Sequence, residues 1–297
     1  MKKIFYIIAL GVGLAGCSNN EDELLSTGSF PEDHVIRIIT EVNEPLSRAG
    51  YDVTNLERFG LMIRNSENAA YNYHKQMVSS GNAWSTSDGQ QMLWDAERTP
   101  VTMIAYAPYM SEAAPDASLV VNALTNQTTE ENVKSSDFLL MKATVDPEQD
   151  LTADGKLKIS LSHAMSKLLI KITVNGTTDA AMNKLGDMSI NGAVVNGICD
   201  LSATVPIVVP APDAVVATVA PYKGTESCEC ILPPQKIVEG FSVNFSYDGK
   251  LYIWTAKEAI ELEKGVEHTL TLNVNTTVRL AAKMARNWAT GQLIDRN

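Results

Sequence analysis

The stretch Lys156–Val174, KLKISLSHAMSKLLIKITV, is the longest run of strand-like alternation in the first two thirds of the sequence. Its apolar residues first occupy odd positions and, after Lys167, even positions: Leu157, Ile159, Leu161 and Met165, then Leu168, Ile170, Ile172 and Val174. Because side chains of a strand alternate between its two faces, a slip of one residue moves the apolar set to the opposite face. The reversal predicts a bulge or corner near His163–Lys167, with the first half serving one sheet and the second half another. The alternative is two separate strands joined by a tight turn, although no Gly, Pro or Asn marks such a turn.

The rest of the chain shows little helical periodicity and many short alternating runs separated by Gly, Asn, Asp and Pro, which is typical of all-β sandwiches. The roughly 265 residues that follow the N-terminal segment exceed one ordinary domain, so we expect two tandem antiparallel β-sandwich domains. The polar segment Asp146–Gly155 carries both a Pro and a Gly. We therefore assign residues 35–150 to an N-terminal sandwich and residues 151–297 to a C-terminal sandwich.

Within this frame, the clearest hairpin is Phe241–Thr255, where Asp248-Gly249 can supply the positive φ angles of a type I′ turn. The alternation from Leu270 to Leu280 predicts a strand that keeps one apolar face over that length. Residues 281–291 predict a short helix. Other predicted strands are Val35–Val42, Phe59–Ile63, Val101–Tyr109, Ser118–Leu124, Asp137–Val145, Met188–Val195 and Glu229–Leu232.

The N-terminus has the layout of a secretory signal peptide over residues 1–16, with a short basic start and an apolar run too short to span a bilayer. It ends in Leu14-Ala15-Gly16-Cys17, which resembles a lipobox. We expect signal cleavage between Gly16 and Cys17 and lipidation of the Cys17 thiol. The alternative is an ordinary signal peptide followed by a chance cysteine.

Residues 17–34 are predicted to be a flexible tether, because the polar run Ser18–Glu23 lacks the apolar residues needed to order it. Its acidic residues also resemble export signals of surface lipoproteins in some Gram-negative bacteria. The formal net charge of the whole chain is -11. Removing residues 1–16 takes away Lys2 and Lys3 and no acidic residue, which leaves -13. Such a surface repels phosphate backbones, so we expect no nucleic-acid partner.

Three cysteines remain after Cys17: Cys199, Cys228 and Cys230. Cys228 and Cys230 would share one face of a strand and do not pair readily with each other. A disulfide from Cys199 to either of them fits an oxidising compartment. Three buried thiols are the favoured alternative.

No catalytic motif of the serine hydrolase, zinc protease or phosphate-loop type is present, and we expect neither an enzyme nor a bound cofactor. None of the four histidines has a metal-like spacing with another ligand. His163 is interpreted as a satisfied histidine of the core or seam. Trp84 and Trp94 could form a sugar-stacking platform, but sandwich cores use the same residue type, and we favour the core.

Several short motifs, in a fixed order, give the chain a resemblance to the fimbrillin family, in its Mfa-like group, whose members build type V pili. They are the lipobox ending at Cys17, Ser47-Arg48-Ala49, Ala105-Tyr106-Ala107-Pro108-Tyr109, His163-Ala164-Met165-Ser166-Lys167-Leu168, Leu232-Pro233-Pro234-Gln235, and Trp288 with Gly291. Together they cover nearly all of the sequence that follows the signal peptide.

The resemblance implies that the protein crosses the outer membrane as a lipoprotein and that an arginine-specific protease cuts between Arg48 and Ala49. The cut would release the first strand, which comprises Val35, Ile36, Arg37, Ile38, Ile39, Thr40, Glu41 and Val42. A strand of a neighbouring subunit would fill the groove through main-chain hydrogen bonds and alternate side-chain pockets. At about 3.3 Å per residue, these eight residues span roughly 26 Å of groove.

Three interpretations follow. The first is a pilus subunit matured at Arg48, with a tip position slightly favoured over the shaft because the tail after Leu280 is a poor strand by pattern. The second is an uncleaved anchor or accessory lipoprotein of the same family. The third is a surface glycan-binding lipoprotein that uses exposed aromatic residues. The implied partners are other pilus subunits, the outer membrane through the lipid on Cys17, and a host or bacterial surface ligand.

Overall fold

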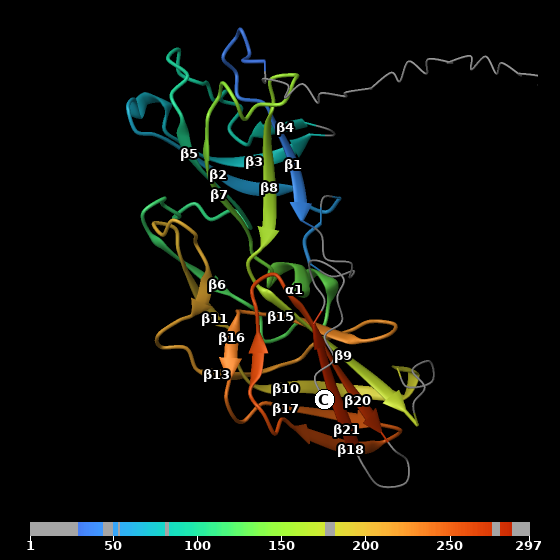
Figure 1. Ribbon diagram of the computed structural model, residues 1–297. Coiled ribbons are helices and arrows are strands. Elements are labelled where there is room, and N and C mark those ends of the chain that lie inside the picture. The colour runs from blue at the N-terminus through green and yellow to red at the C-terminus, as the bar shows by residue number, and fades with distance from the viewer. Residues whose placement is uncertain are drawn as a thin grey trace, which may run out of the picture.

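The protein is almost entirely β-structure in the computed structural model, which describes residues 29–43, 50–52, 54–80, 83–175, 182–274 and 280–286 (Figure 1). Of Asn43 and of residues 280–286 only the backbone is described. The helical elements in these ranges are α1 (Glu130–Ser135) and the 3₁₀ turns η1 (Ala69–Tyr71) and η2 (Met182–Lys184). Within this part of the chain, no helix combines the length and apolar character needed to cross a membrane. The all-β prediction is therefore confirmed.

A seven-stranded sheet, here called the upper sheet, lies at the top of Figure 1. Its strands, in spatial order, are β1 (Ile38–Asn43), β8 (Leu157–His163), β7 (Leu139–Val145), β5 (Val101–Ala107), β2 (Arg58–Asn65), β3 (Tyr73–Ser80) and β4 (Ala83–Thr86). Neighbours run antiparallel except β1 and β8, which are parallel. One face of this sheet encloses a hydrophobic cluster that includes Phe59, Leu61, Met103, Ile159 and Leu161.

Two further sheets pack face to face in the lower half of Figure 1, and we call them the lower sandwich. The first contains β14 (Tyr222–Lys223), β15 (Cys228–Leu232), β9 (Ser166–Val174), β20 (Glu267–Val274) and β21 (Leu280–Arg286). The second contains β13 (Val216–Val219), β10 (Leu185–Val194), β17 (Ser242–Tyr247) and β18 (Lys250–Thr255). Between them lies a second cluster, to which Ile170, Ile190, Phe245 and Leu272 contribute.

Two small sheets complete the fold. The first consists of β12 (Val208–Pro210), β11 (Asn196–Asp200) and β6 (Ser118–Asn122), and the second of β16 (Gln235–Ile237) and β19 (Ile260–Leu262). The inner residues Leu119 and Cys199 of the three-stranded sheet belong to the same cluster as Ile104 and Tyr106 of β5. The core of the lower sandwich therefore continues onto the second face of the upper sheet.

The Lys156–Val174 stretch turns a corner where its apolar phase reverses, as predicted. Strand β8 ends at His163, the buried residues Ala164 and Met165 follow, and β9 begins at Ser166. Leu157, Ile159 and Leu161 of β8 lie in the cluster of the upper sheet, and Leu168, Ile170 and Ile172 of β9 lie in the cluster of the lower sandwich. One run of chain therefore serves two sheets.

The division into two domains at residue 150 stays a prediction. Strand β8, which lies after that position, pairs with β1 and β7 of the upper sheet. Strand β6, which lies before it, pairs with β11. The sheets therefore combine segments from both sides of residue 150.

The Asp248-Gly249 hairpin is confirmed, since β17 pairs with β18 and both turn residues have positive φ angles of 51° and 74°. The end of the chain differs from the prediction. Strand β20 ends at Val274, and β21 runs back beside it with Leu280 opposite Val274. The helix predicted for residues 281–291 is wrong over residues 281–286, because backbone pairing with β20 outweighs the local helix preference of an alanine-rich segment. Residues 287–291 lie outside the described range.

The three cysteines of the described part of the chain are free thiols and all are buried, so the disulfide alternative is wrong. Burial raises the pKa of the Cys199 thiol to about 11 and that of Cys228 to about 12. Both thiols therefore stay protonated and unreactive at neutral pH.

Candidate functional site

Strand β1 forms an edge of the upper sheet and, among the described strands, pairs with β8 alone. Ile38 lies opposite Leu157 and Val42 opposite Leu161 in a parallel register with β8. Figure 1 shows the blue β1 arrow lying beside β8. The remaining six strands stay hydrogen-bonded in an unbroken order without β1. Its loss would expose the edge of β8 without dividing the sheet.

The inward face of β1 and of the residues before it is apolar. Ile36, Ile38 and Val42 are 7%, 4% and 6% exposed and belong to the cluster of the upper sheet. Burying aliphatic side chains of this size contributes about 1.5–3 kcal/mol each. Without β1, the same cluster would present an apolar groove beside Leu157, Ile159 and Leu161 of β8.

The second wall of the groove comes from the opposite edge of the sheet. Trp84 Nε1 of β4 donates a hydrogen bond to Thr40 Oγ1 of β1 over 3.0 Å, and the indole ring packs edge-on against Phe59 with centroids 4.7 Å apart. Just before β1, Ile36 N donates to Met92 O over 2.9 Å, and Trp94 N donates to His34 O over 2.8 Å. The segment from His34 to Thr40 therefore forms hydrogen bonds with β4 and with the segment Met92–Trp94, in addition to its pairing with β8.

These contacts place both tryptophans of the sugar-platform alternative in the core. Trp94 is 2% exposed, and Trp84 is half-buried against the cluster of the upper sheet. The preference for a core role is confirmed. Neither ring forms an exposed platform.

The outward face of β1 carries charged side chains. Glu41 Oε2 lies 2.8 Å from Lys158 Nζ of β8, and Ser160 Oγ donates to Glu41 Oε1. The hydrogen bonds from Lys158 and Ser160 hold the pKa of Glu41 below its usual value. Arg37 pairs with Asp33 over 2.6 Å and, chiefly through this hydrogen bond, lowers the pKa of Asp33 to about 2. Both ion pairs are exposed to water.

Arg48 and Ala49, the predicted cleavage site, lie outside the described residues, as do the predicted lipidation residues Gly16 and Cys17. Of the predicted first strand, residues Ile38–Val42 lie in β1, and Val35 forms an isolated bridge with Leu93. The residues from Val35 to Val42 are thus one continuous segment on the edge of the sheet.

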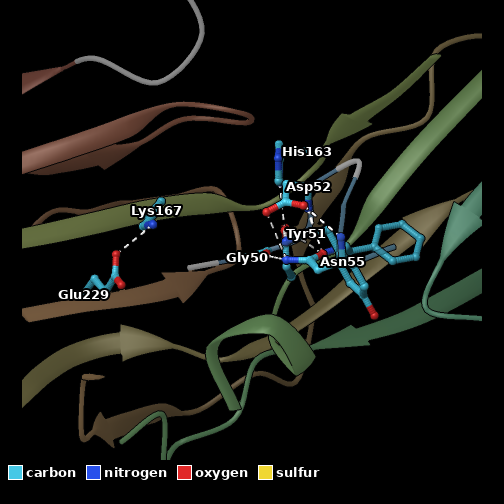
Figure 2. Close-up of polar contacts among 9 residues, drawn as sticks. Gly50, Tyr51, Asp52, Asn55, His163, Lys167 and Glu229 are labelled. Carbon is cyan, nitrogen blue, oxygen red and sulfur yellow. Dashed lines mark hydrogen bonds and ion pairs between the residues drawn. The ribbon is translucent and has the colours of Figure 1, made fainter. Parts of the chain in front are cut away.

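Gly50 and Tyr51, which follow the predicted cleavage site, are anchored on the corner between β8 and β9 (Figure 2). Tyr51 N donates to Asp137 Oδ2 over 3.0 Å, and His163 Nδ1 lies 2.8 Å from the same oxygen. Gly50 has a φ of +118°, and a Cβ atom there would lie 3.1 Å from Asp137 Oδ2. A glycine is therefore needed at this position. Burial, together with Asp137 and Glu131, raises the pKa of Tyr51 to about 12.

The corner also holds a fully buried ion pair. Lys167 Nζ of β9 lies 2.7 Å from Glu229 Oε2 of β15, and the two side chains are 0% and 8% exposed (Figure 2). His163 and Lys167, which begin and end the predicted corner, thus each have an acidic partner from another strand or loop. The interpretation of His163 as a satisfied seam histidine is confirmed.

A comparison of the sequence with family models identifies the family. The model of a family described as fimbrillin-like matches residues 47–287. The chain belongs to the fimbrillin-like family. Fimbrillin-like proteins are structural proteins of fimbriae and cell adhesion rather than enzymes. No curated protein sequence matches the chain.

Solved structures show the same fold at low identity. A candidate cell adhesion protein from Bacteroides uniformis has a TM-score of 0.63 at 16% identity, with 86% of this chain and 98% of that chain covered. A fimbrial protein from Bacteroides ovatus has a TM-score of 0.51 at 15% identity, covering 83% of this chain and 51% of that chain. The tip fimbrial protein Mfa3 from Porphyromonas gingivalis has a TM-score of 0.50 at 9% identity, covering 85% and 99%.

In this fimbrillin-like chain, sequence reasoning placed Thr40 in the released strand and favoured a core role for Trp84, but it did not predict the hydrogen bond between them. It missed Asp137 as part of the site, because nothing near Asp137 in the sequence indicates that it binds Tyr51. Only the fold brings these residues together. The described residues contain no group of three or more His, Cys, Asp and Glu side chains arranged to hold a metal ion.

Proposed function

We propose that this fimbrillin-like protein is a subunit of a cell-surface pilus that associates with other pilus subunits by strand exchange at the groove of β1. Cleavage between Arg48 and Ala49 frees the segment from Val35 to Val42, and a strand of a neighbouring subunit takes its place. Before cleavage, the protein is held in the outer membrane by a lipid on Cys17. The tether comprises residues 17–28 rather than 17–34, because Phe30 packs against the upper-sheet cluster and Trp94 N donates to His34 O.

The edge position of β1 is the observation that supports this proposal best. Within the described part of the chain, this strand pairs with β8 and no other strand, and the segment from Asn43 to Gly50 that follows it contains Arg48. Cutting that segment leaves β1 attached by non-covalent contacts only. The anchor of Gly50 and Tyr51 on Asp137 keeps the residues after the cut in place.

The test is limited proteolysis of the purified, unlipidated protein from Ser18 onward with an arginine-specific protease. We expect a first stable product that begins at Ala49 and then forms oligomers in size-exclusion chromatography. The variant Arg48→Lys should resist the protease. The matched variant Arg58→Lys, at the exposed start of β2, should be cut like the wild type.

A first cut elsewhere, or a product cut at Arg48 that stays monomeric, would contradict the proposal and favour the uncleaved anchor. The slight preference for a tip position was based on the poor strand pattern after Leu280. Because residues 280–286 form strand β21, that reason no longer supports the tip. A shaft subunit has to donate a strand as well as accept one. Oligomers of the cleaved protein alone would therefore favour the shaft.

A further inference from the structure

We propose that the groove of β1 selects its incoming strand by a hydroxyl group at the position of Thr40. The partner is a β-strand of another subunit whose inward residues read apolar, apolar, Ser or Thr, apolar, in the places of Ile36, Ile38, Thr40 and Val42. This inference rests on the proposed function and specifies the partner that the groove fits.

The selecting group is the indole N–H of Trp84. It can donate a hydrogen bond but cannot accept one, and in the intact chain it donates to Thr40 Oγ1 over 3.0 Å. The ring is held edge-on against Phe59, whose own side chain is fully buried. The N–H therefore keeps its direction when the occupant of the groove changes.

An occupant without an acceptor at this point would cover the indole N–H and leave it without a hydrogen bond. An unsatisfied, partly buried donor weakens binding by roughly tenfold. A serine or threonine keeps the bond. A valine has nearly the shape of threonine but lacks the oxygen. Comparing the two residues therefore measures the contribution of the hydrogen bond separately from that of side-chain packing.

The apolar positions discriminate less, because exchanging one aliphatic side chain for another changes hydrophobic contact by only a methylene or two. They also leave the register open. Sliding the strand by two residues keeps its apolar face inward but puts Ile38 or Val42 against the indole N–H. The hydroxyl subsite thus fixes register as well as choice of partner.

The experiment uses the chain from Ser18 onward, with the site of a sequence-specific protease placed within residues 44–49, so that release of β1 does not depend on Arg48. After cleavage, the protein is mixed with fluorescent peptides of residues 31–43, and binding is measured by fluorescence anisotropy. The peptides are the natural sequence and its Thr40→Ser and Thr40→Val variants. Each is tested with the wild-type groove and with Trp84→Phe, which keeps a ring against Phe59 but has no N–H.

We expect the serine peptide to bind within about twofold of the natural one and the valine peptide about tenfold more weakly. In the Trp84→Phe protein the valine penalty should vanish, which identifies the pair by a double-mutant cycle. The uncleaved chain, with its groove occupied, should bind none of the peptides.

Equal binding of the valine and threonine peptides to the wild-type groove would overturn this inference while leaving strand exchange intact. The same conclusion follows if the valine penalty persists in Trp84→Phe. A cleaved protein that takes up none of the peptides would instead refute strand exchange at this groove, and the inference with it.

Discussion

Two lysine–glutamate pairs flank the corner of the Lys156–Val174 stretch, and they differ in little except burial. On one side, Lys158 of β8 pairs with Glu41 of β1 over 2.8 Å, and the side chains are 52% and 42% exposed. On the other side, Lys167 of β9 pairs with Glu229 of β15 over 2.7 Å, and the side chains are 0% and 8% exposed. The same chemistry occurs within ten residues of one chain segment.

Under the proposed strand exchange, this difference distinguishes β1, an edge strand that could be replaced, from β9, which is held on both sides. An exposed pair is screened by water and contributes little, so β1 depends on main-chain bonds and side-chain packing that another strand could supply. Removing one charge of a buried pair is strongly destabilising, because the other charge then stays buried without a partner of opposite sign. Strand β9 is also flanked on both sides, by β15 and β20, whereas β8 meets β1 at an open edge.

The largest effect is expected from Lys167→Met, which leaves Glu229 buried without its cation. Glu267, the register partner of Lys167 on β20, is also buried, so the change removes a cation from a region that holds two buried acidic residues. We expect the free energy of unfolding, measured by urea denaturation of the full chain, to fall by about 3–5 kcal/mol. The matched change Lys158→Met should cost less than about 1 kcal/mol.

The double variant Lys167→Met with Glu229→Met controls for lost packing. Replacing both charges by apolar groups of similar size should recover most of the lost stability. Equal losses of unfolding free energy in Lys167→Met and Lys158→Met would contradict the comparison, since burial would then not determine how much each ion pair contributes to stability.

The corner itself shows what the sequence could predict. The phase reversal between Leu161 and Leu168 is a local pattern, and the structure follows it because each half must bury its own apolar face. The parallel pairing of β1 with β8 could not be predicted in this way, since its partners lie more than a hundred residues apart. The contacts Trp84–Thr40 and Tyr51–Asp137 depend on that same tertiary arrangement. In residues 281–286 the local signal was misleading, because the partner strand β20 and not the segment's own composition decides its structure.

The pH dependence of stability provides a second comparison of the buried β9 side with the exposed β1 side of the corner. On the β9 side, the relevant group is His268 of β20, the register partner of Leu168. Burial lowers the pKa of His268 to about 4, and its Nε2 accepts a hydrogen bond from Glu263 N over 3.0 Å, which requires the neutral ring. Since the folded-state pKa lies below the unfolded value of about 6.5, the stabilisation is present above pH 6.5. It is lost as the pH falls from about 6.5 to 4 and amounts to at most about 3.5 kcal/mol.

The measurement is the thermal unfolding midpoint between pH 7.5 and 4. In His268→Gln the decline across this window should be clearly flatter than in the wild type. Burial also lowers the pKa of His74, so a smaller decline remains in the variant. Parallel curves for the two proteins would exclude His268 as the source. The carboxylates beside β1 contribute only at the acid end of this window, because the folded-state pKa values of Asp33 and Glu41 are lowered and their stabilisation is lost as the pH falls below unfolded values of about 4. This loss is the same in both proteins, so it does not change the difference between their curves.

The smallest effect is expected for Glu41→Gln on β1. The change removes the ion pair with Lys158 but keeps a side chain that can accept from Ser160, and the site is open to water. The cost in unfolding free energy should be at most about 0.5 kcal/mol, and it should shrink further in 0.5 M salt, where exposed charges are screened. Glu41→Gln in a Lys158→Gln background should then have no additional effect. A loss of several kcal/mol would mean that β1 is held by a specific charge contact, and a replacement strand would have to carry an acid at the same place. A small loss would mean that, in the proposed strand exchange, an incoming subunit has to match chiefly the inward face of the strand.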